Sequence, residues 1–165
     1  MTAPQTLAPE AGSVAPDVEL PDEHGTLHRL SEQRGRWTVV YFYHEDDTPG
    51  GTVEARQLRD LDSAIRVAGG DVWGVSPAGP ASHRRYREKF GVPFTLLSDP
   101  DHRLAEAYGA WQLKTLYGRK YWGIQRSSFL IDPEGRIARA WPKVKADGHA
   151  AEVLTALAEA RAARA

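Results

Sequence analysis

The sequence predicts a mixed α/β domain in which helices cover both faces of one central sheet. Residues 37–43 form a near-continuous run of β-branched and aromatic side chains, which is typical of a strand covered on both faces. Residues 48–70 then show helical spacing of apolar side chains. The turn sequence at residues 132–135 separates two alternating segments. The 165 residues are enough for one domain with a full core.

A short hairpin is expected first. Residues 18–20 and 26–30 flank a turn-rich stretch at residues 22–25, as in two paired strands. After the strand at residues 37–43, a helix opens at Thr48-Pro49-Gly50. Its inward residues recur every three or four positions, and these are Leu58, Leu61, Ile65 and Ala68. The pair Gly69-Gly70 ends this helix.

The remaining segments continue the alternation of strands and helices. The apolar segments predict strands over residues 71–76, 94–97, 127–132 and 136–141. Between them, helices are expected over residues 82–90 and from about residue 101 to residue 108. Asp147 is expected to cap a final helix that buries Val153, Leu154 and Leu157. There are no internal repeats or linkers, so we expect a flexible tail over residues 1–14 and one domain over residues 15–165.

Composition excludes several classes of function. The formal net charge of −1 at pH 7 offers no field that would attract nucleic acid or an anionic membrane. The longest apolar run, residues 37–43, is far too short to span a bilayer. Residues 1–16 are rich in alanine and proline and lack the pattern of a secretory leader, so a cytoplasmic location is expected.

The chain contains no cysteine, and its only sulfur atom belongs to Met1. A disulfide framework is therefore excluded. Chemistry that needs a thiolate nucleophile is excluded too, because a thioether at the start of an expected tail cannot replace it.

The segment from Tyr41 to Arg56 resembles the active-site strand, loop and helix start of the Q-type peroxiredoxins, also called bacterioferritin-comigratory proteins, within the AhpC/TSA superfamily. Their motif carries the peroxide-attacking cysteine where this chain has Gly51, and the resolving cysteine where it has Arg56. The resemblance covers nearly everything after residue 12 and implies a thioredoxin-like fold with a central mixed sheet. Further matching segments are residues 12–17, 20–22, 74–76, 94–100 and 117–132.

The resemblance also assigns roles to four retained residues. It implies that the Thr48 hydroxyl hydrogen-bonds peroxide, that Pro49 shields the pocket, and that the Arg126 guanidinium lies beside the sulfur. Glu54 takes the position of a first-turn glutamate, where the helix dipole favours an acid. Each residue also has a purely structural interpretation: Thr48 as a cap, Glu54 as a dipole partner and Arg126 as a partner of a carboxylate.

The leading hypothesis is a peroxiredoxin-fold protein that has lost thiol peroxidase activity but keeps a small pocket for an anion or peroxide. Thr48, the amides near Gly51, and Arg126 would line that pocket, with no cofactor and no metal. One alternative is an enzyme that consumes peroxide by non-thiol chemistry, with a metal near His44 or an aromatic radical. Another is an interaction protein that binds thioredoxin-like partners or unfolded chains. Glycine and arginine codons each lie one nucleotide from cysteine codons, which favours natural divergence over engineering.

Other clusters have ordinary interpretations. Residues 44–47 gather one imidazole and three carboxylates and read as a solvated acidic loop. Residues 83–87 and Arg56 are expected to lie on solvated helix faces, and His149 to be a packing residue with its polar atoms satisfied. A monomer is expected, with one aromatic cluster as the candidate dimer patch: Trp111, Tyr117, Tyr121 and Trp122.

Overall fold

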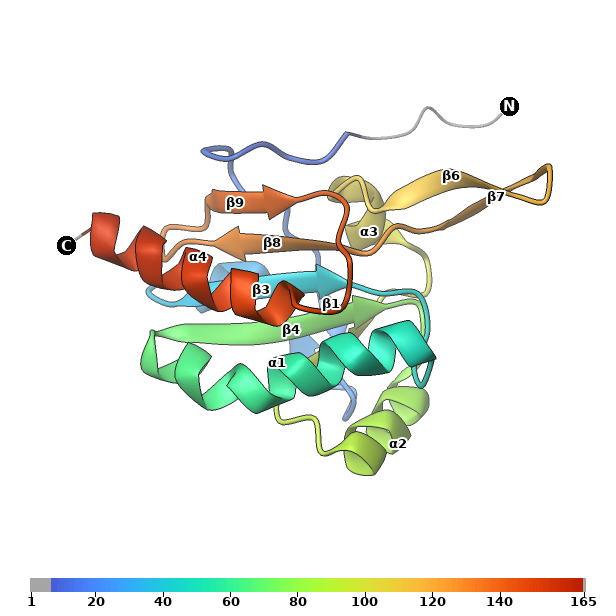
Figure 1. The fold of residues 1–165 in the computed structure, drawn as a ribbon, viewed down its shortest axis with the longest axis horizontal. Coiled ribbons are helices and arrows are strands. Elements are labelled where there is room, and N and C mark those ends of the chain that lie inside the picture. Colours follow the sequence, from blue (N-terminus) through green and yellow to red (C-terminus); the bar gives the residue numbers. More distant parts are fainter. Residues whose placement is uncertain (1–6, 165) are drawn as a thin grey trace.

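A computed structural model describes residues 7–164 and confirms the α/β architecture, with one five-stranded mixed sheet at its centre (Figure 1). The strand order is β5-β4-β3-β8-β9. The neighbours β3, β4 and β5 run parallel, whereas β8 is antiparallel to both β3 and β9. The strand bounds are β3 Trp37–Phe42, β4 Gly70–Ser76, β5 Thr95–Ser98, β8 Ser127–Ile131 and β9 Ile137–Trp141.

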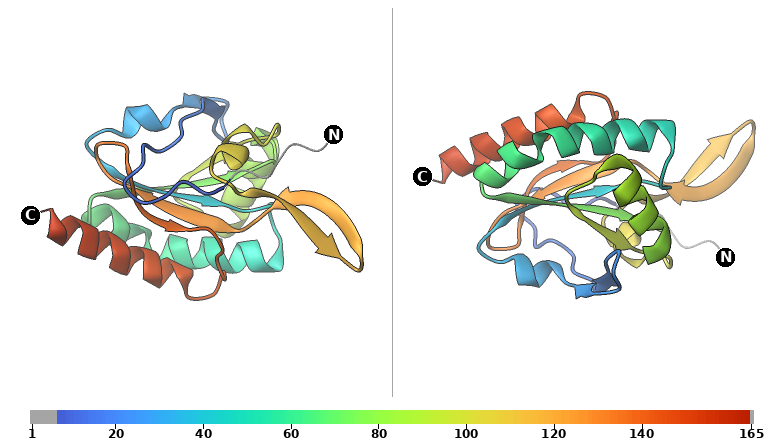
Figure 2. Two further views of the ribbon diagram at one scale, coloured as in Figure 1. Left: turned by 90° about the horizontal axis from the view of Figure 1, so that it is seen from above. Right: turned by 90° about the horizontal axis from the view of Figure 1, so that it is seen from below.

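Helices and short elements cover both faces of the sheet (Figure 2). The long helices α1 (Pro49–Val67) and α4 (His149–Ala163) lie together on one face, and α2 (Pro80–Phe90) packs beside α1 near the β5 edge. The other face is covered by the 3-10 helix η1 (Leu30–Gln33), by α3 (Arg103–Ala107), and by the expected hairpin, whose strands are β1 (Leu20–Pro21) and β2 (Leu27–His28).

The central strand β3 divides the core into two apolar layers. All six of its residues are buried, as its unbroken apolar run predicts. Val39 and Tyr41 point into the layer under α1 and α4, whereas Val40 and Phe42 point into the layer under α3 and η1. Because β3 leads directly into the loop before α1, this packing also fixes where α1 begins.

The segment before residue 15 is held along β9. Gly12 N donates to Ile137 O, Ile137 N donates to Ser13 O, and Val14 forms an isolated bridge with Arg136. The expected tail over residues 1–14 therefore includes a paired stretch, because these amides complete the free edge of the sheet. Its first six residues lie outside the described part of the chain.

Two helix starts differ from the sequence predictions. Asp147 does not cap α4: its carboxylate accepts a hydrogen bond from Gln57 Nε2, and the cap position is Gly148, at φ 85°. The helix α3 starts later than expected, at Arg103. The side chain of Asp99 accepts hydrogen bonds from the amides of Leu104 and Ala105 and so satisfies its first turn.

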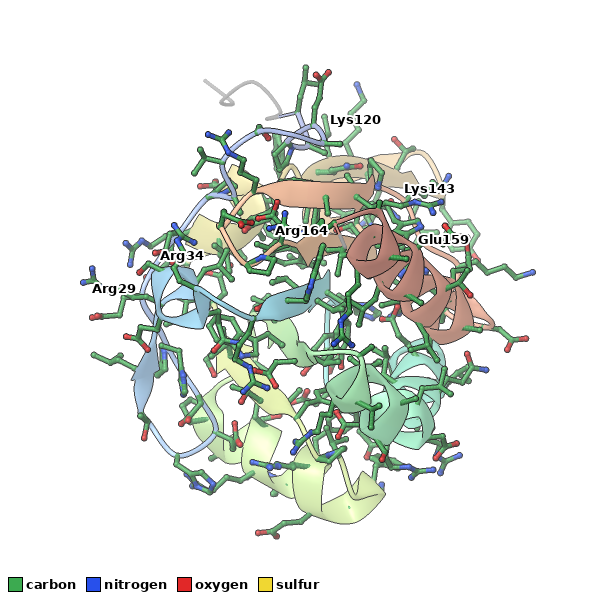
Figure 3. The ribbon with its side chains drawn as sticks, turned by 90° about the vertical axis from the view of Figure 1, so that its left-hand side faces the viewer. Arg29, Arg34, Lys120, Lys143, Glu159 and Arg164 are labelled. Carbon is green, nitrogen blue, oxygen red and sulfur yellow. The ribbon has the colours of Figure 1, made fainter. Side chains whose placement is uncertain are left out.

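The 3-10 helix η1 and one pair of strands were not predicted from the sequence. Strands β6 (Trp111–Leu116) and β7 (Arg119–Ile124) form a separate two-stranded ribbon that projects from the body beyond the end of the sheet (Figures 1 and 2). At the other end of the molecule, Arg164 forms ion pairs with Asp132 and Glu134 in the β8–β9 turn and ties the end of α4 to the sheet (Figure 3). Within residues 7–164, no helix is long and apolar enough to cross a membrane.

The core leaves no room at Gly74, in the middle of β4. An added Cβ would lie 2.8 Å from Leu96 Cδ2 and 2.9 Å from Tyr41 Cζ. We predict that Gly74→Ala lowers the free energy of unfolding by about 1–3 kcal/mol, because the buried ring of Tyr41 must shift to admit the methyl group. Urea unfolding followed by circular dichroism measures the change.

The matched control is Gly79→Ser, where an added Cβ meets no atom within 4 Å. Gly79 is the N-cap of α2, a position that accepts serine well, so its stability should change by less than about 0.5 kcal/mol. Equal stability of the Gly74→Ala variant and the wild type would contradict the close packing at Tyr41.

Candidate functional site

The candidate site lies where β3 ends and α1 begins. Thr48 has an extended backbone, at φ −103° and ψ 153°, and is the N-cap of α1. Its side-chain oxygen accepts a hydrogen bond from Gly51 N at 3.3 Å, and Pro49 is the first residue of the helix. Proline suits this position because its missing N–H would have no partner there. The capping interpretation of Thr48 is therefore confirmed.

Gly51 is buried, and its missing side chain would point toward Thr48. A Cβ at Gly51 would lie 3.0 Å from Thr48 Oγ1 and 3.5 Å from Glu45 O. A Cβ at the preceding Gly50 would lie 3.4 Å from Arg126 Nη2. The hydroxyl of Thr48 thus lies beside Gly51, and the guanidinium of Arg126 beside the neighbouring Gly50.

Arg126 is fixed by a buried ion pair with Glu54. Its Nη1 donates to Glu54 Oε1 at 2.9 Å. The Glu54 side chain is fully buried, and that of Arg126 is 15% exposed. Glu54 is the sixth residue of α1, so its expected place in the first turn was wrong. The pair joins α1 to the start of β8, which also fixes the distance between the guanidinium and the helix N-terminus.

Burial raises the pKa of Glu54 to about 7, although the charge and the hydrogen bond of Arg126 act in the opposite direction. The second carboxylate oxygen, Oε2, has no hydrogen-bond partner within the described residues. One guanidinium contact on a single oxygen is too little to offset the loss of hydration in full. Glu54 is therefore a buried acid that changes its charge near neutral pH.

Two further cations belong to the site and were missed in the sequence. Lys114, on the ribbon, donates from Nζ to the backbone carbonyl of Ile124. Burial, and then the nearby charges of Arg126 and Lys143, lower the pKa of Lys114. Lys143 is exposed and lies in the loop between β9 and α4 (Figure 3). Lys114 and Lys143 thus add positive charge near Arg126, and of these three cations only Arg126 has a carboxylate partner among the described residues.

Arg56 lies on the solvated face of α1, as expected, with its guanidinium 5.1 Å from the centre of the Phe90 ring. The helical rise separates positions 51 and 56 by about 7.5 Å along the axis. Cysteines at these two positions could form a disulfide only if the first turns of α1 unwound, since a disulfide requires much closer Cα atoms.

Two of the ordinary interpretations were wrong in part, although His44, Glu45 and Asp47 are exposed as expected. Asp46 is not solvated: it accepts hydrogen bonds from the hydroxyls of Tyr43 and Ser82, and its Oδ2 lies 2.8 Å from His83 Nδ1. His83 and Tyr86 are buried, so residues 83–87 are not a uniformly solvated face. These contacts attach the loop before α1 to α2. A single sequence does not reveal them, because the partners are far apart in the chain.

His149 is buried against Trp141, but its Nε2 has no partner within the described residues, so it is packed but not fully satisfied. The residues 7–164 contain no group of three or more His, Cys, Asp or Glu side chains arranged to hold a metal ion. His44 and its acidic neighbours therefore do not converge on a common point.

The raised pKa of Glu54 predicts an unusual pH dependence of stability. The folded protein binds this proton more tightly than the unfolded chain, so the contribution is full below about pH 4.5 and is lost as pH rises through about 7. In the variant Glu54→Gln this loss should disappear. The difference in unfolding free energy between variant and wild type should change by on the order of 3 kcal/mol across the window, in favour of the variant at high pH.

Urea unfolding at several pH values measures that difference. The exposed Glu88→Gln is the matched control: it keeps Glu54, so its unfolding free energy should follow that of the wild type across the window. A wild type that gains stability relative to Glu54→Gln as pH rises would show that Arg126 holds the carboxylate ionised and would refute the prediction.

Comparison with known proteins agrees with this geometry. Residues 11–140 match the AhpC/TSA family. The chain is 45% identical to Peroxiredoxin Bcp of Bacillus subtilis over 148 residues, which is 90% of this chain and 94% of that protein. It is 42% identical to Peroxiredoxin Bcp of Escherichia coli over 150 residues, covering 91% of this chain and 96% of that protein.

A solved structure of the Xanthomonas campestris bacterioferritin comigratory protein, studied for its alkyl peroxide reduction activity, superposes with a TM-score of 0.86. It is 40% identical and covers 92% of this chain and 99% of its own. The matches span the sheet, α1 and the candidate site together. The chain therefore belongs to the AhpC/TSA family of peroxiredoxins, and within it to the bacterioferritin-comigratory, or Q-type, group.

Proposed function

We propose that this protein has no thiol peroxidase activity and uses the former peroxide site to bind a small anion. The observation that carries the proposal is the combination of Gly51 at the nucleophile position with the Arg126 guanidinium beside the first turn of α1, and with Lys114 close enough to Arg126 and Lys143 for their charges to act on it. The first half of the proposal follows from chemistry, because attack on peroxide by this family's route requires a thiolate.

The second half follows from charge. In a site with cysteine, a thiolate would supply the negative charge that these cations and the helix N-terminus favour. Among residues 7–164, Glu54 is paired with Arg126, and the hydrogen-bond partner of Lys114 is the backbone carbonyl of Ile124. A small oxyanion or carboxylate would occupy the position of the sulfur and of the bound peroxide. It would accept a hydrogen bond from the amide of Gly50, and from that of Gly51 in exchange for its 3.3 Å bond to Thr48 Oγ1.

The rival functions have less support. Non-thiol peroxide chemistry through a metal would need converging ligands, and residues 7–164 do not offer a group of three. A monomeric state and a cytoplasmic location remain our proposals. A role in binding other polypeptides is compatible with the anion site, since it would use a different surface.

The absence of turnover is directly testable. With thioredoxin, its reductase and hydrogen peroxide supplied, consumption of the reductant should not exceed that of a boiled control, because the chain holds no cysteine. Alkyl peroxides should give the same result. Sustained consumption above the boiled control would disprove the loss of activity and would direct attention to non-thiol chemistry.

Anion binding has a local readout. Titration with phosphate, sulfate or acetate should shift the amide NMR signals of Gly50, Gly51 and Thr52 in a saturable way, because these groups lie in the first turn of α1. Lys114→Gln and Lys143→Gln should each weaken the binding several-fold, by removing a charge near the bound anion.

Lys145→Gln is the matched control, since Lys145 is an exposed lysine two positions from Lys143. It should leave the titration unchanged. Shifts that spread over the whole surface without saturation, or that persist in both lysine variants, would contradict an anion site at the helix N-terminus.

A further inference from the structure

The ribbon formed by β6 and β7 is a free-standing pair of strands. Its residues pair from Trp111 with Ile124 to Leu116 with Arg119. Within residues 7–164, no hydrogen bond joins the backbone of residues 113–122 to any element other than the facing strand. Each strand therefore presents one edge of unpaired N–H and C=O groups, which is a template for a further strand.

The register separates the side chains of the ribbon onto two faces. On one face Leu113 pairs with Trp122, and Trp122 stacks on Trp111 with ring centres 6.3 Å apart. On the other face Lys114 pairs with Tyr121 and Leu116 pairs with Arg119. The first face supports the ribbon on the body, since His102 stacks on Trp111 at 3.6 Å.

The outer part of the ribbon exposes large apolar side chains. Leu113 is 42% exposed, Leu116 55%, Tyr121 45%, and Tyr117 at the tip 96%. Natural sequences protect open strand edges by replacing apolar residues with charged ones. In this ribbon the exposed apolar side chains remain next to charged ones. Protection of the strand edges alone therefore does not explain why the ribbon has these residues. Apolar groups gathered at an exposed position are typical of an interaction surface.

The tip contains a residue that its turn does not favour. Tyr117 and Gly118 have φ values of 51° and 76°, as a two-residue hairpin turn requires. Asparagine or glycine adopts a positive φ more readily than tyrosine. The aromatic side chain of Tyr117 is almost fully in solvent, so neither the turn nor the packing of the fold explains a tyrosine at this position.

The charge of the ribbon is of one sign. No acidic residue occurs between Ala110 and Ile131, although the whole chain has a net charge of −1. Of the cations in this stretch, Arg119 and Lys120 are exposed, and neither forms an ion pair with any residue in the described chain. A partner for this edge must therefore carry negative charge as well as apolar side chains.

We propose that the ribbon binds an extended acidic segment of another protein, which adds as a third strand to one of its free edges. Backbone hydrogen bonds to the open edge would hold the segment. Its carboxylates would contact Lys120 on one face of the ribbon, and its alternate apolar side chains would cover Leu116 and Tyr121 on the other. Arg119, next to the turn, would add to the attraction of the acidic segment, and Tyr117 at the tip would pack against its end. This surface adjoins the anion site, since Lys114 lies on the same ribbon opposite Tyr121, but the proposed contacts do not use the Lys114 side chain.

The test uses the full chain and a labelled short peptide that alternates glutamate with valine and threonine. Fluorescence anisotropy should show saturable binding that weakens as salt rises, because the contact between charges is screened. A peptide of the same sequence with alternate backbone amides methylated should bind at least about tenfold more weakly, because it cannot add as a strand.

Two variants locate the contact while keeping the ribbon folded. Arg119→Glu with Lys120→Glu should weaken binding by about tenfold or more, and Tyr117→Asn should weaken it while suiting the turn better. The control pair Lys145→Glu with Arg161→Glu changes charge by the same amount elsewhere and should bind as the wild type does. Circular dichroism and thermal unfolding check that each variant is folded.

Several outcomes would overturn the proposal. They are no binding of the acidic peptide up to about 1 mM, equal binding of a lysine-for-glutamate peptide, or equal binding of the methylated peptide. Tighter binding of single-stranded DNA would assign the surface to nucleic acid instead. A stable dimer at micromolar concentration that Tyr117→Asn dissociates would assign it to a second copy of this chain.

Discussion

The ion pair between Glu54 and Arg126 is the contact on which the site depends. It joins the second turn of α1 to the start of β8 and lies between the helices and the sheet. A buried pair of this kind costs much of its own attraction in lost hydration, and Glu54 still has one oxygen without a partner. Although the pair stabilises the fold little, it holds the Arg126 guanidinium beside the N-terminus of α1. This chain therefore keeps a positive group close to the position where its relatives' motif has a cysteine, although it has no thiolate itself.

The parts of the fold that are set by local patterns could be predicted from the sequence. All six residues of β3 are buried, and α1 buries the side of the helix that carries Leu58, Leu61 and Ile65. Because burial of this kind leaves a regular apolar pattern in the sequence, the pattern alone identifies both elements. The ribbon was missed because it buries little, and its side chains follow the register of two strands outside the sheet. The cap of α4 was misassigned because Asp147 has a more distant partner, Gln57.

The residues of the candidate site divide in the same way, into those that the sequence located and those that only the folded structure brings together. Thr48, Pro49 and Gly51 lie within four consecutive residues at the start of α1, so a short motif located them. The resemblance supplied Arg126 and Glu54. Lys114 and the buried Asp46–His83 contact come from segments far apart in the chain, and only the folded structure brings them together. Lys114 adds a positive charge near Arg126 that the motif alone does not indicate, which supports the proposal of an anion rather than a neutral ligand.

The most direct test of the retained geometry is the thiol pKa of Gly51→Cys, followed by ultraviolet absorbance of the thiolate. The new Cβ fits if Thr48 Oγ1, 3.0 Å away, shifts slightly. Because the helix N-terminus and the cations favour the thiolate, the pKa should fall below the free value of about 8.5. The thiol should also react with peroxide faster than free cysteine. An ordinary pKa together with ordinary reactivity would show that the site no longer stabilises negative charge, and would contradict the account.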